Sequence, residues 1–230
     1  MTTTVSNSTQ PTIAVLGGTG AEGSGLALRW ARAGYPVVIG SRNADKAAQV
    51  CAQMNAKLKR DAVTHQNYLA AAAAAQIIVL CVPYAAQRAT VEEVRSALNG
   101  KILIDTTVPL LPPKVMRVQL PEGGSAVAAI QTLLGESVRV VSAFQNVAAH
   151  LLQDLDCNVD CDVLVCGNDV PARETVVKLA EDIGLRGIHA GQIGNSAAAE
   201  ALTSILISIN SRYKTHGAGI RITGLDRGET

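Results

Sequence analysis

The chain has 230 residues, of which 48% are hydrophobic and 17% charged, and its formal net charge is +1. This length can supply a substantial core and predicts one large domain with an appended smaller lobe. A net charge near zero and only six aromatic residues argue against a surface for nucleic acid or anionic membranes.

Several features of the sequence predict a soluble, cytoplasmic protein. Residues 1–11 are mostly polar, which predicts a disordered tail without an export signal. The longest apolar run, residues 69–82, is too short to span a bilayer. The five cysteines include no CxxC pair, which indicates reduced thiols. Three of these cysteines lie among acidic residues, but their spacing fits no standard zinc pattern, so we predict no metal site at Cys157, Cys161 and Cys166.

Up to residue 143 the chain alternates short apolar runs with segments of helical spacing. Strands are predicted at 13–16, 37–40, 62–65, 76–81, 101–105 and 138–142. Helices are predicted at 26–33, 43–58, 67–75, 84–98 and 126–134. This alternation predicts an α/β fold with a Rossmann-type, doubly wound, right-handed parallel sheet over residues 12–143. The connection at 106–124 holds four prolines and is long enough to form a lid or a cleft wall.

The remaining residues predict a smaller C-terminal α/β lobe, residues 144–230, which completes a substrate cleft. Its expected strands are 162–166 and 185–189, and its expected helices are 171–182 and 196–213. The last helix is apolar on more than one face. Such a helix either is buried in the lobe or joins two copies of the chain, and we predict a homodimer.

A glycine-rich turn lies between the first strand and the first helix. It contains the pattern Gly18-x-Gly20-x-x-Gly23, which in this context is typical of dinucleotide-binding proteins. A tight turn, a pyrophosphate lying against bare backbone and a helix packed close to its strand each exclude a Cβ atom. The backbone N–H groups at the start of the helix are then expected to face the phosphates.

The end of the second strand indicates which dinucleotide is bound. NAD-binding units place an Asp or Glu there for the ribose hydroxyls. This chain has Ser41 and Arg42 instead, with Lys46 one helical turn further on. A hydroxyl and two cations would bind a 2′-phosphate, whereas a carboxylate would repel it. The sequence therefore predicts NADP(H) as the cofactor.

The expected cleft lies beyond the carboxyl ends of the strands and is mostly neutral. It offers no Ser-His-Asp set, no pair of metal ligands and no Lys or His placed to protonate a forming alcohol. Of the four histidines, His150 is the candidate to face the cleft. Direct hydride transfer between two bound rings needs orientation and exclusion of water more than a strong acid or base. A second redox cofactor as the substrate fits such a cleft.

With three segments in view, the chain resembles the NADPH-dependent coenzyme F-420 reductase family, in which NADP(H) exchanges hydride with a 5-deazaflavin. These are the fingerprint, the Gly40-Ser41-Arg42 strand end and the segment Ala143-Phe144-Gln145-Asn146-Val147. The likeness extends from about residue 13 to residue 225. Around the fingerprint the N-terminal domains of membrane ferric reductases also look similar.

The resemblance implies a role for each matching residue. The 2′-phosphate would be held by Thr19, Ser41, Arg42 and Lys46, and the pyrophosphate by Gly18 and Gly20. Val82 and Pro83 match the segment beside the nicotinamide. Gln145, Asn146 and Val147 match the segment facing the deazaflavin, where the two rings would stack. The cations Arg212, Lys214 and Arg221 could hold the anionic tail of coenzyme F-420 or simply complement the dipole of the last helix.

The expected function is hydride transfer between NADP(H) and coenzyme F-420 or a related flavin. Two alternatives stay open at this point. One is an NADP-dependent reductase of a small imine or carbonyl, with His150 or Tyr84 supplying the proton. The other is a non-catalytic protein that senses NADP.

Overall fold

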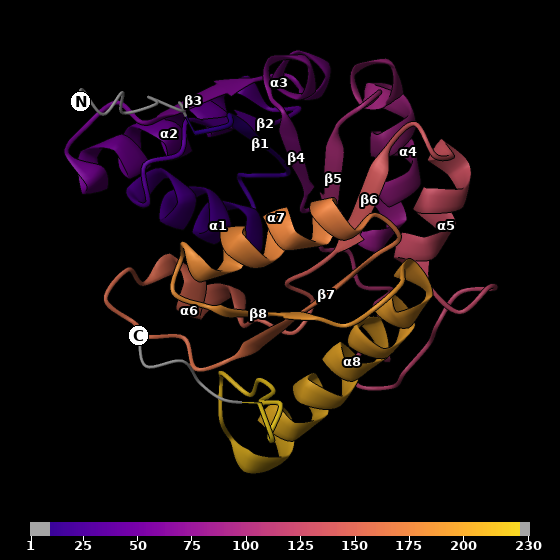
Figure 1. Cartoon of the computed structure of the whole chain (residues 1–230). Helices are drawn as coiled ribbons and strands as arrows, with labels where there is room; N and C mark the ends of the chain where they lie inside the picture. Colours follow the sequence, from indigo (N-terminus) through magenta and orange to yellow (C-terminus); the bar gives the residue numbers. More distant parts are fainter. Residues whose placement is uncertain (1–9, 226–230) are drawn as a thin grey trace, which may run out of the picture.

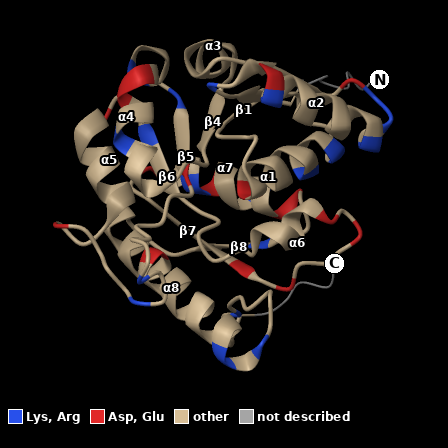
Figure 2. Ribbon diagram, turned by 180° about the vertical axis from the view of Figure 1, so that it is seen from behind, with Lys and Arg blue, Asp and Glu red and all other residues tan. Residues whose placement is uncertain are grey.

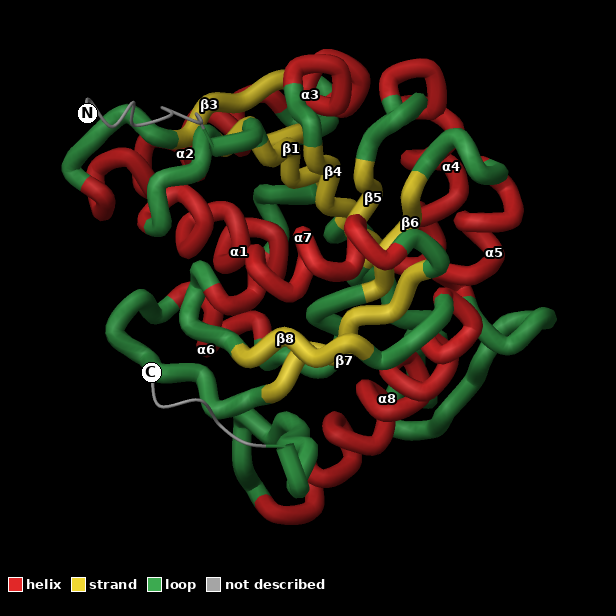
Figure 3. Tube along the Cα trace, in the orientation of Figure 1, coloured by secondary structure: helices red, strands yellow, loops and turns green. Residues whose placement is uncertain are grey.

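A computed structural model of the protein describes residues 10–225, so most of the disordered tail predicted at 1–11 lies outside the described residues. The described chain forms one eight-stranded sheet in the order β3-β2-β1-β4-β5-β6-β7-β8, with helices on both faces (Figure 1, Figure 3). The strands are β1 (Ile13–Leu16), β2 (Val37–Gly40), β3 (Val63–Gln66), β4 (Ile77–Leu80), β5 (Ile102–Asp105), β6 (Arg139–Ser142), β7 (Asp162–Gly167) and β8 (Arg186–His189).

The helices mostly confirm the predicted segments. They are α1 (Ala21–Arg32), α2 (Ala44–Leu58), α3 (Tyr68–Ala74), α4 (Tyr84–Val94), α5 (Ala126–Leu134), α6 (Ala149–Gln153), α7 (Val170–Glu181) and α8 (Ser196–Tyr213), with 3₁₀ turns η1 (Arg95–Ala97) and η2 (Ile193–Asn195). Helix α1 begins five residues earlier than predicted, because its first turn is part of the glycine-rich segment. The short helix α6 was not predicted, and 106–124 is a loop as expected.

Strands β1 to β6 are all parallel, as predicted, and the strand order reverses between β1 and β4. Strand β7 differs, because it runs antiparallel to β6 through the pairs Val141↔Gly167 and Ser142↔Cys166. A parallel neighbour requires a crossover that returns the chain to the opposite end of the sheet. Residues 143–161 hold only the one-turn helix α6 and make no such return. The division into parts 12–143 and 144–230 stays a prediction.

The alternation of side chains along each strand divides the core into two layers. Ile13 and Val15 face the layer that includes α1, α2 and α7, and Ala14 and Leu16 face the layer that includes α3, α4 and α5. Both faces of the central strands are therefore buried, which is why these strands read as continuous apolar runs.

Four helices begin at a side-chain cap. The side-chain oxygen accepts a hydrogen bond from a backbone N–H of the first turn in each case; the caps are Asn43 for α2, Asn67 for α3, Ser125 for α5 and Asp169 for α7. Helix α1 begins at Gly20 without a side-chain cap. The N–H groups of its first turn therefore have no side-chain oxygen at the cap position, as an anion-binding helix start requires.

Positions of Lys and Arg and positions of Asp and Glu are interspersed along the ribbon drawn in Figure 2. None of the helices in residues 10–225 has the length and apolar character needed to cross a membrane.

Candidate functional site

The turn after β1 needs glycine at three positions for reasons internal to the protein. Gly17 has a φ of +83° and lies so close to β4 that a Cβ atom would stand 2.3 Å from the carbonyl oxygen of Cys81. A Cβ at Gly18 would stand 2.9 Å from the oxygen of Val15, and one at Gly23 would stand 2.8 Å from the oxygen of Gly17. Only Gly17 has the positive φ expected of the turn, and close packing explains the other two.

Gly20 is less crowded than these three glycines. It is exposed at the start of α1, and a Cβ atom there would meet only the oxygen of Gly17, at 3.3 Å. Thr19 beside it is partly exposed. The fold therefore gives less reason for glycine here than at Gly17, Gly18 or Gly23, whereas a ligand lying against the start of α1 would add one.

The ends of β1 and β2 lie side by side, since Leu16 and Gly40 are register partners. Beyond β2, Ser41 is buried and its hydroxyl bonds the backbone of Asn43 at 3.1 Å. Arg42 and Lys46 are both exposed. The structure thus places two accessible cations next to the glycine turn and no carboxylate in the segment 40–42, which fits a phosphate better than a free ribose.

The end of β4 closes the other side of the turn. The N–H of Cys81 donates to the oxygen of Leu16 at 2.8 Å, which locks β4 against β1. Val82 is buried and Pro83 is exposed as the cap residue of α4. These two residues lie at the reversal point of the sheet, where ligands of such folds bind.

Residues 144–147, which follow β6, are fixed by contacts inside the protein. Phe144 has a φ of +73°, and its ring packs edge-on against Trp30 with centroids 5.7 Å apart. The Gln145 amide donates to the oxygen of Asp105 and the Asn146 amide to the oxygen of Ala199, each at 2.8 Å. Gln145, Asn146 and Val147 are all buried. Contact between this segment and a second ring stays a prediction. In such a contact, the side chains of Gln145 and Asn146 would touch the ring while their amides keep these hydrogen bonds to the protein backbone.

Buried acids form a feature of the site that the sequence analysis missed. Asp105 is fully buried at the end of β5, where the Gln87 amide donates to it at 2.7 Å and the N–H of Thr107 at 2.9 Å. Burial raises the pKa of this carboxyl, and these hydrogen bonds oppose the rise. Glu22 in the first turn of α1 has its pKa raised to about 8, chiefly by burial. The sequence did contain a signal for Asp105, because it is a polar residue at the end of an otherwise apolar strand.

A third buried acid joins α8 to α5. The carboxylate of Glu200 accepts hydrogen bonds from the Ser125 hydroxyl at 2.6 Å and from the N–H of Ala126 at 2.7 Å. The N–H of Val127 donates to it at 3.2 Å. Burial raises the pKa of Glu200, and these bonds lower it. The end of the 106–124 loop is thereby fixed to the C-terminal helix.

The other cations and the histidine considered in the sequence are exposed on the C-terminal part of the chain. His150 is exposed on α6, and Arg221 forms an ion pair with Asp160 at 3.2 Å. Arg212 and Lys214 are exposed at the end of α8, on the side of the molecule opposite β3 (Figure 1). All five cysteines are free. Within residues 10–225 there is no group of three or more His, Cys, Asp or Glu side chains that could hold a metal ion.

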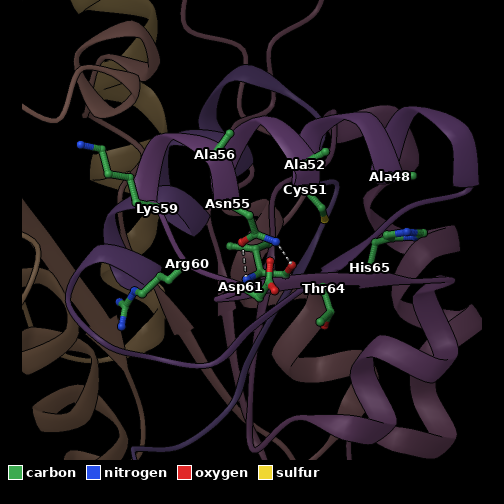
Figure 4. Close-up of a pocket in the computed structure, with 11 residues that line it drawn as sticks. Ala48, Cys51, Ala52, Asn55, Ala56, Lys59, Arg60, Asp61, Thr64 and His65 are labelled. Atoms are coloured by element: carbon green, nitrogen blue, oxygen red, sulfur yellow. Dashed lines mark hydrogen bonds between the residues drawn. The ribbon is translucent and has the colours of Figure 1, made fainter.

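A hollow of about 860 Å³ lies between α2 and the edge strand β3, outside the cleft (Figure 4). One wall carries Ala48, Ala52 and Ala56 of α2. Asn55 braces its floor by accepting from the N–H of Val63 and donating to the oxygen of the same residue, both at 2.9 Å. None of the predicted cofactor residues lines this hollow.

Comparison with known proteins gives consistent results along the chain. Residues 12–109 match the family described as NADP oxidoreductase, coenzyme F420-dependent. The F420-dependent NADP reductase of Methanocaldococcus jannaschii is 42% identical, covering 93% of this chain and 99% of that protein. The protein of the same name from Methanothermobacter thermautotrophicus is 40% identical, with 94% and 97% covered.

A solved structure from Arthrobacter sp. FB24, assigned as an F420-dependent NADP reductase, covers 92% of this chain and 98% of its own. It superimposes with a TM-score of 0.77 at 26% identity. The fold is therefore the Rossmann-like α/β fold that the sequence predicts. Because identity above 40% extends over nearly the full length of both chains, this protein belongs to the family of F420-dependent NADP reductases.

Proposed function

We propose that the protein is an NADP-dependent oxidoreductase that transfers hydride directly between NADP(H) and the deazaflavin coenzyme F-420. The observation that carries the proposal is the length of the similar region, which covers 93% of this chain and 99% of the Methanocaldococcus jannaschii relative. It therefore includes both the nucleotide-binding turn and the segments after residue 109 that would meet the second substrate.

The residues of the glycine turn and its neighbours would bind NADP(H). The diphosphate would lie against Gly18, Gly20 and Gly23, where the first N–H groups of α1 have no side-chain cap. The 2′-phosphate would be held by Thr19, Ser41, Arg42 and Lys46, and the nicotinamide would lie beside Val82 and Pro83. The residues present fit this cofactor, since two exposed cations follow β2, the strand next to β1, and α1 begins at an exposed glycine that packing explains only weakly.

The second ring would lie against Gln145, Asn146 and Val147, with residues 144–230 completing the cleft. When bound, NADPH supplies the hydride and the deazaflavin accepts it. The protein's task is to hold the two rings face to face and to exclude water. Internal hydrogen bonds hold the side-chain amides of Gln145 and Asn146, which suits a segment that positions a ring.

Anaerobic stopped-flow mixing tests the proposal. The protein and NADPH are mixed in turn with oxidised coenzyme F-420, FMN or FAD, and the visible absorbance of each acceptor is followed. Rapid bleaching of coenzyme F-420 alone is the expected result. Bleaching of FMN or FAD instead would keep ring-to-ring transfer and change the acceptor. If NADPH binds and no acceptor is reduced, the proposed reaction is wrong.

We also propose that two copies associate through α8. Ile205, Ile209 and Tyr213 recur every four residues, so they share one helix face, and they are 45%, 36% and 75% exposed. A row of exposed apolar side chains of this kind favours a protein contact. Sedimentation analysis of the wild type and of Ile205→Glu tests this proposal. A wild type that sediments as a monomer at micromolar concentration would contradict it.

The proposed compartment is the cytoplasm. Five free cysteines, among them the buried Cys51 and Cys166, fit a reducing environment.

A further inference from the structure

Gly25 is a glycine that the dinucleotide-binding unit itself does not explain. It is buried inside α1, beyond the pattern Gly18-x-Gly20-x-x-Gly23. A glycine in the middle of a helix costs about 0.5–1 kcal/mol relative to alanine. A Cβ atom at Gly23 would meet the turn and the end of β4, whereas a Cβ atom at Gly25 would meet Leu152 of α6. Gly25 therefore serves the contact between α1 and the second half of the chain.

Helix α6 lies directly on α1 at this position. A Cβ atom at Gly25 would stand 2.6 Å from the Cβ of Leu152 and 3.2 Å from the backbone nitrogen of Gln153. Because these are Cβ and backbone atoms, no change of rotamer relieves the overlap. Ordinary contacts begin near 3.4 Å, so an alanine at residue 25 would press α6 away from α1 by about 0.8 Å.

A side chain of α6 attaches the two helices at a second point. The Gln153 amide donates to the carbonyl oxygen of Ala21 at 3.1 Å and to the hydroxyl of Ser24 at 3.0 Å. Both acceptors lie in the first turn of α1, which is the end of the helix that is proposed to hold the diphosphate of NADP(H). Helix α6 is thus fixed to the part of α1 that is nearest to the cofactor.

The residues before α6 are the ones proposed to face the second ring, 145–147. Phe144 precedes them, and its ring packs edge-on against Trp30 of α1 with centroids 5.7 Å apart. Helix α6 begins at Ala149, two residues after this segment, and lies beside α1 (Figure 1). The ring-facing residues therefore lie between two contacts with α1. One helix would bind the diphosphate at its start and locate the second substrate along its side.

We propose that Gly25 is a positioning residue for hydride transfer, because its missing side chain lets α6 lie against α1 and so sets the spacing between the two rings. This inference rests on the proposed function, in which the nicotinamide lies beside Val82 and Pro83 and the second ring lies against residues 145–147. A misplacement of about 1 Å can slow such a reaction about 100-fold. A methyl group at residue 25 points at α6 and not at the glycine turn, so it should slow transfer without weakening the binding of NADPH.

Single-turnover stopped-flow mixing with NADPH and oxidised coenzyme F-420 tests the inference. Gly25→Ala should lower the rate constant of bleaching about 10- to 100-fold and change the dissociation constant of NADPH less than about threefold. Gly194→Ala is the matched control, because a Cβ atom there has no atom within 4 Å. Lost stability alone would lower the amplitude of bleaching, which reports the fraction of active protein, and not its rate constant.

Two results would overturn the inference and leave the proposed function intact. One is a rate constant for Gly25→Ala within about twofold of the wild type, since a shift of α6 would then not reach the rings. The other is a loss of NADPH affinity as large as the loss of rate, since the start of α1 would then be the part disturbed.

A second variant keeps the test independent of how Gly25→Ala folds. Gln153 is exposed, and Gln153→Ala removes both bonds to the first turn of α1 without adding bulk. Its rate constant should fall about three- to tenfold, whereas Gln53→Ala, at an exposed position of α2, should match the wild type. Deuterium at C4 of NADPH should slow Gly25→Ala and Gln153→Ala at least as much as it slows the wild type, because the affected step is hydride transfer.

If Gly25→Ala does not fold, a wild-type rate constant for Gln153→Ala overturns the inference. A smaller isotope effect in the slowed variants than in the wild type also overturns it, because a step other than hydride transfer would then limit them. If the wild type itself reduces no acceptor, the proposed function and this inference fail together.

Discussion

Replacing Arg29 tests how the cofactor helix is held to the second half of the chain. Arg29 is a buried residue of α1, and its guanidinium donates only to backbone carbonyls. Nε donates to Leu152 at 2.9 Å and Nη1 to Ile183 at 3.2 Å. Nη2 lies within hydrogen-bonding distance of three more carbonyl oxygens, those of Leu151, Asp154 and Cys157. One side chain thus joins α1 to the segment around α6 and to the turn before β8.

The expected loss follows from these bonds. Arg29→Met keeps the apolar stem and removes every donor. Hydrogen bonds from a charged group contribute about 1.5–3 kcal/mol each, and the three nitrogens make at least one bond apiece. Removing the charge offsets part of this loss of stability, since burying a guanidinium is unfavourable. A net destabilisation of about 4 kcal/mol results, which for a chain of this length lowers the melting temperature by roughly 8–16 °C.

Urea unfolding followed by circular dichroism measures this change, and Arg88→Met is the matched control. Arg88 makes an exposed pair with Glu92 on α4, so its replacement should shift stability by less than about 0.5 kcal/mol. A loss below about 1 kcal/mol for Arg29→Met, with an unchanged slope in urea, would refute the reasoning. It would mean that water satisfies the freed carbonyls.

Three further predictions concern the glycine turn. Gly20→Ala should leave the melting temperature within about 2 °C and weaken NADPH binding at least tenfold, whereas Gly23→Ala should lower the melting temperature itself, because its Cβ would stand 2.8 Å from a backbone oxygen. Arg42→Ala should weaken NADPH binding about 10- to 100-fold and NADH binding less than threefold, as measured by fluorescence titration; equal losses for both would contradict a 2′-phosphate contact. Glu22→Gln should stabilise the cofactor-free protein by about 1–3 kcal/mol at pH 8. The unfolded chain releases this proton near pH 4.5 and the folded chain near pH 8, so the advantage in urea unfolding should grow between these values; a constant difference would contradict it.

Local patterns predicted much of this fold because the relevant forces act locally. Strands buried on both faces are apolar along their length, which marks β1 and β4 in the sequence, and β5 up to its last residue, Asp105. The turn is recognisable in the sequence because close backbone packing leaves no alternative to glycine at Gly17, Gly18 and Gly23. Helix α8 was predicted with its observed bounds, since Gly194 and Asn195 precede an unbroken run of helix-forming residues.

Long-range contacts explain what local patterns missed. The reversal at β7 depends on where the chain travels after Phe144, whose positive φ no pattern of apolar residues indicates. Arg29 reads as an ordinary exposed cation of an amphipathic helix until the carbonyls of residues 151–157 surround it. Gln145 and Asn146 read as ligand-facing amides, yet their N–H groups are bonded to the backbone of β5 and α8. For Arg29, Gln145 and Asn146 the partner lies at least 40 residues away.

The strongest structural argument for a cofactor is the set of residues that the fold leaves unexplained. Gly17, Gly18 and Gly23 are explained by packing, and Asn43 by its cap on α2. Gly20 is only weakly explained by packing, because a Cβ there would stand 3.3 Å from one backbone oxygen. Arg42 and Lys46 are cations at a helix start, where the dipole disfavours positive charge. All three lie near the ends of β1 and β2, and an anionic dinucleotide there would account for the glycine and both cations together.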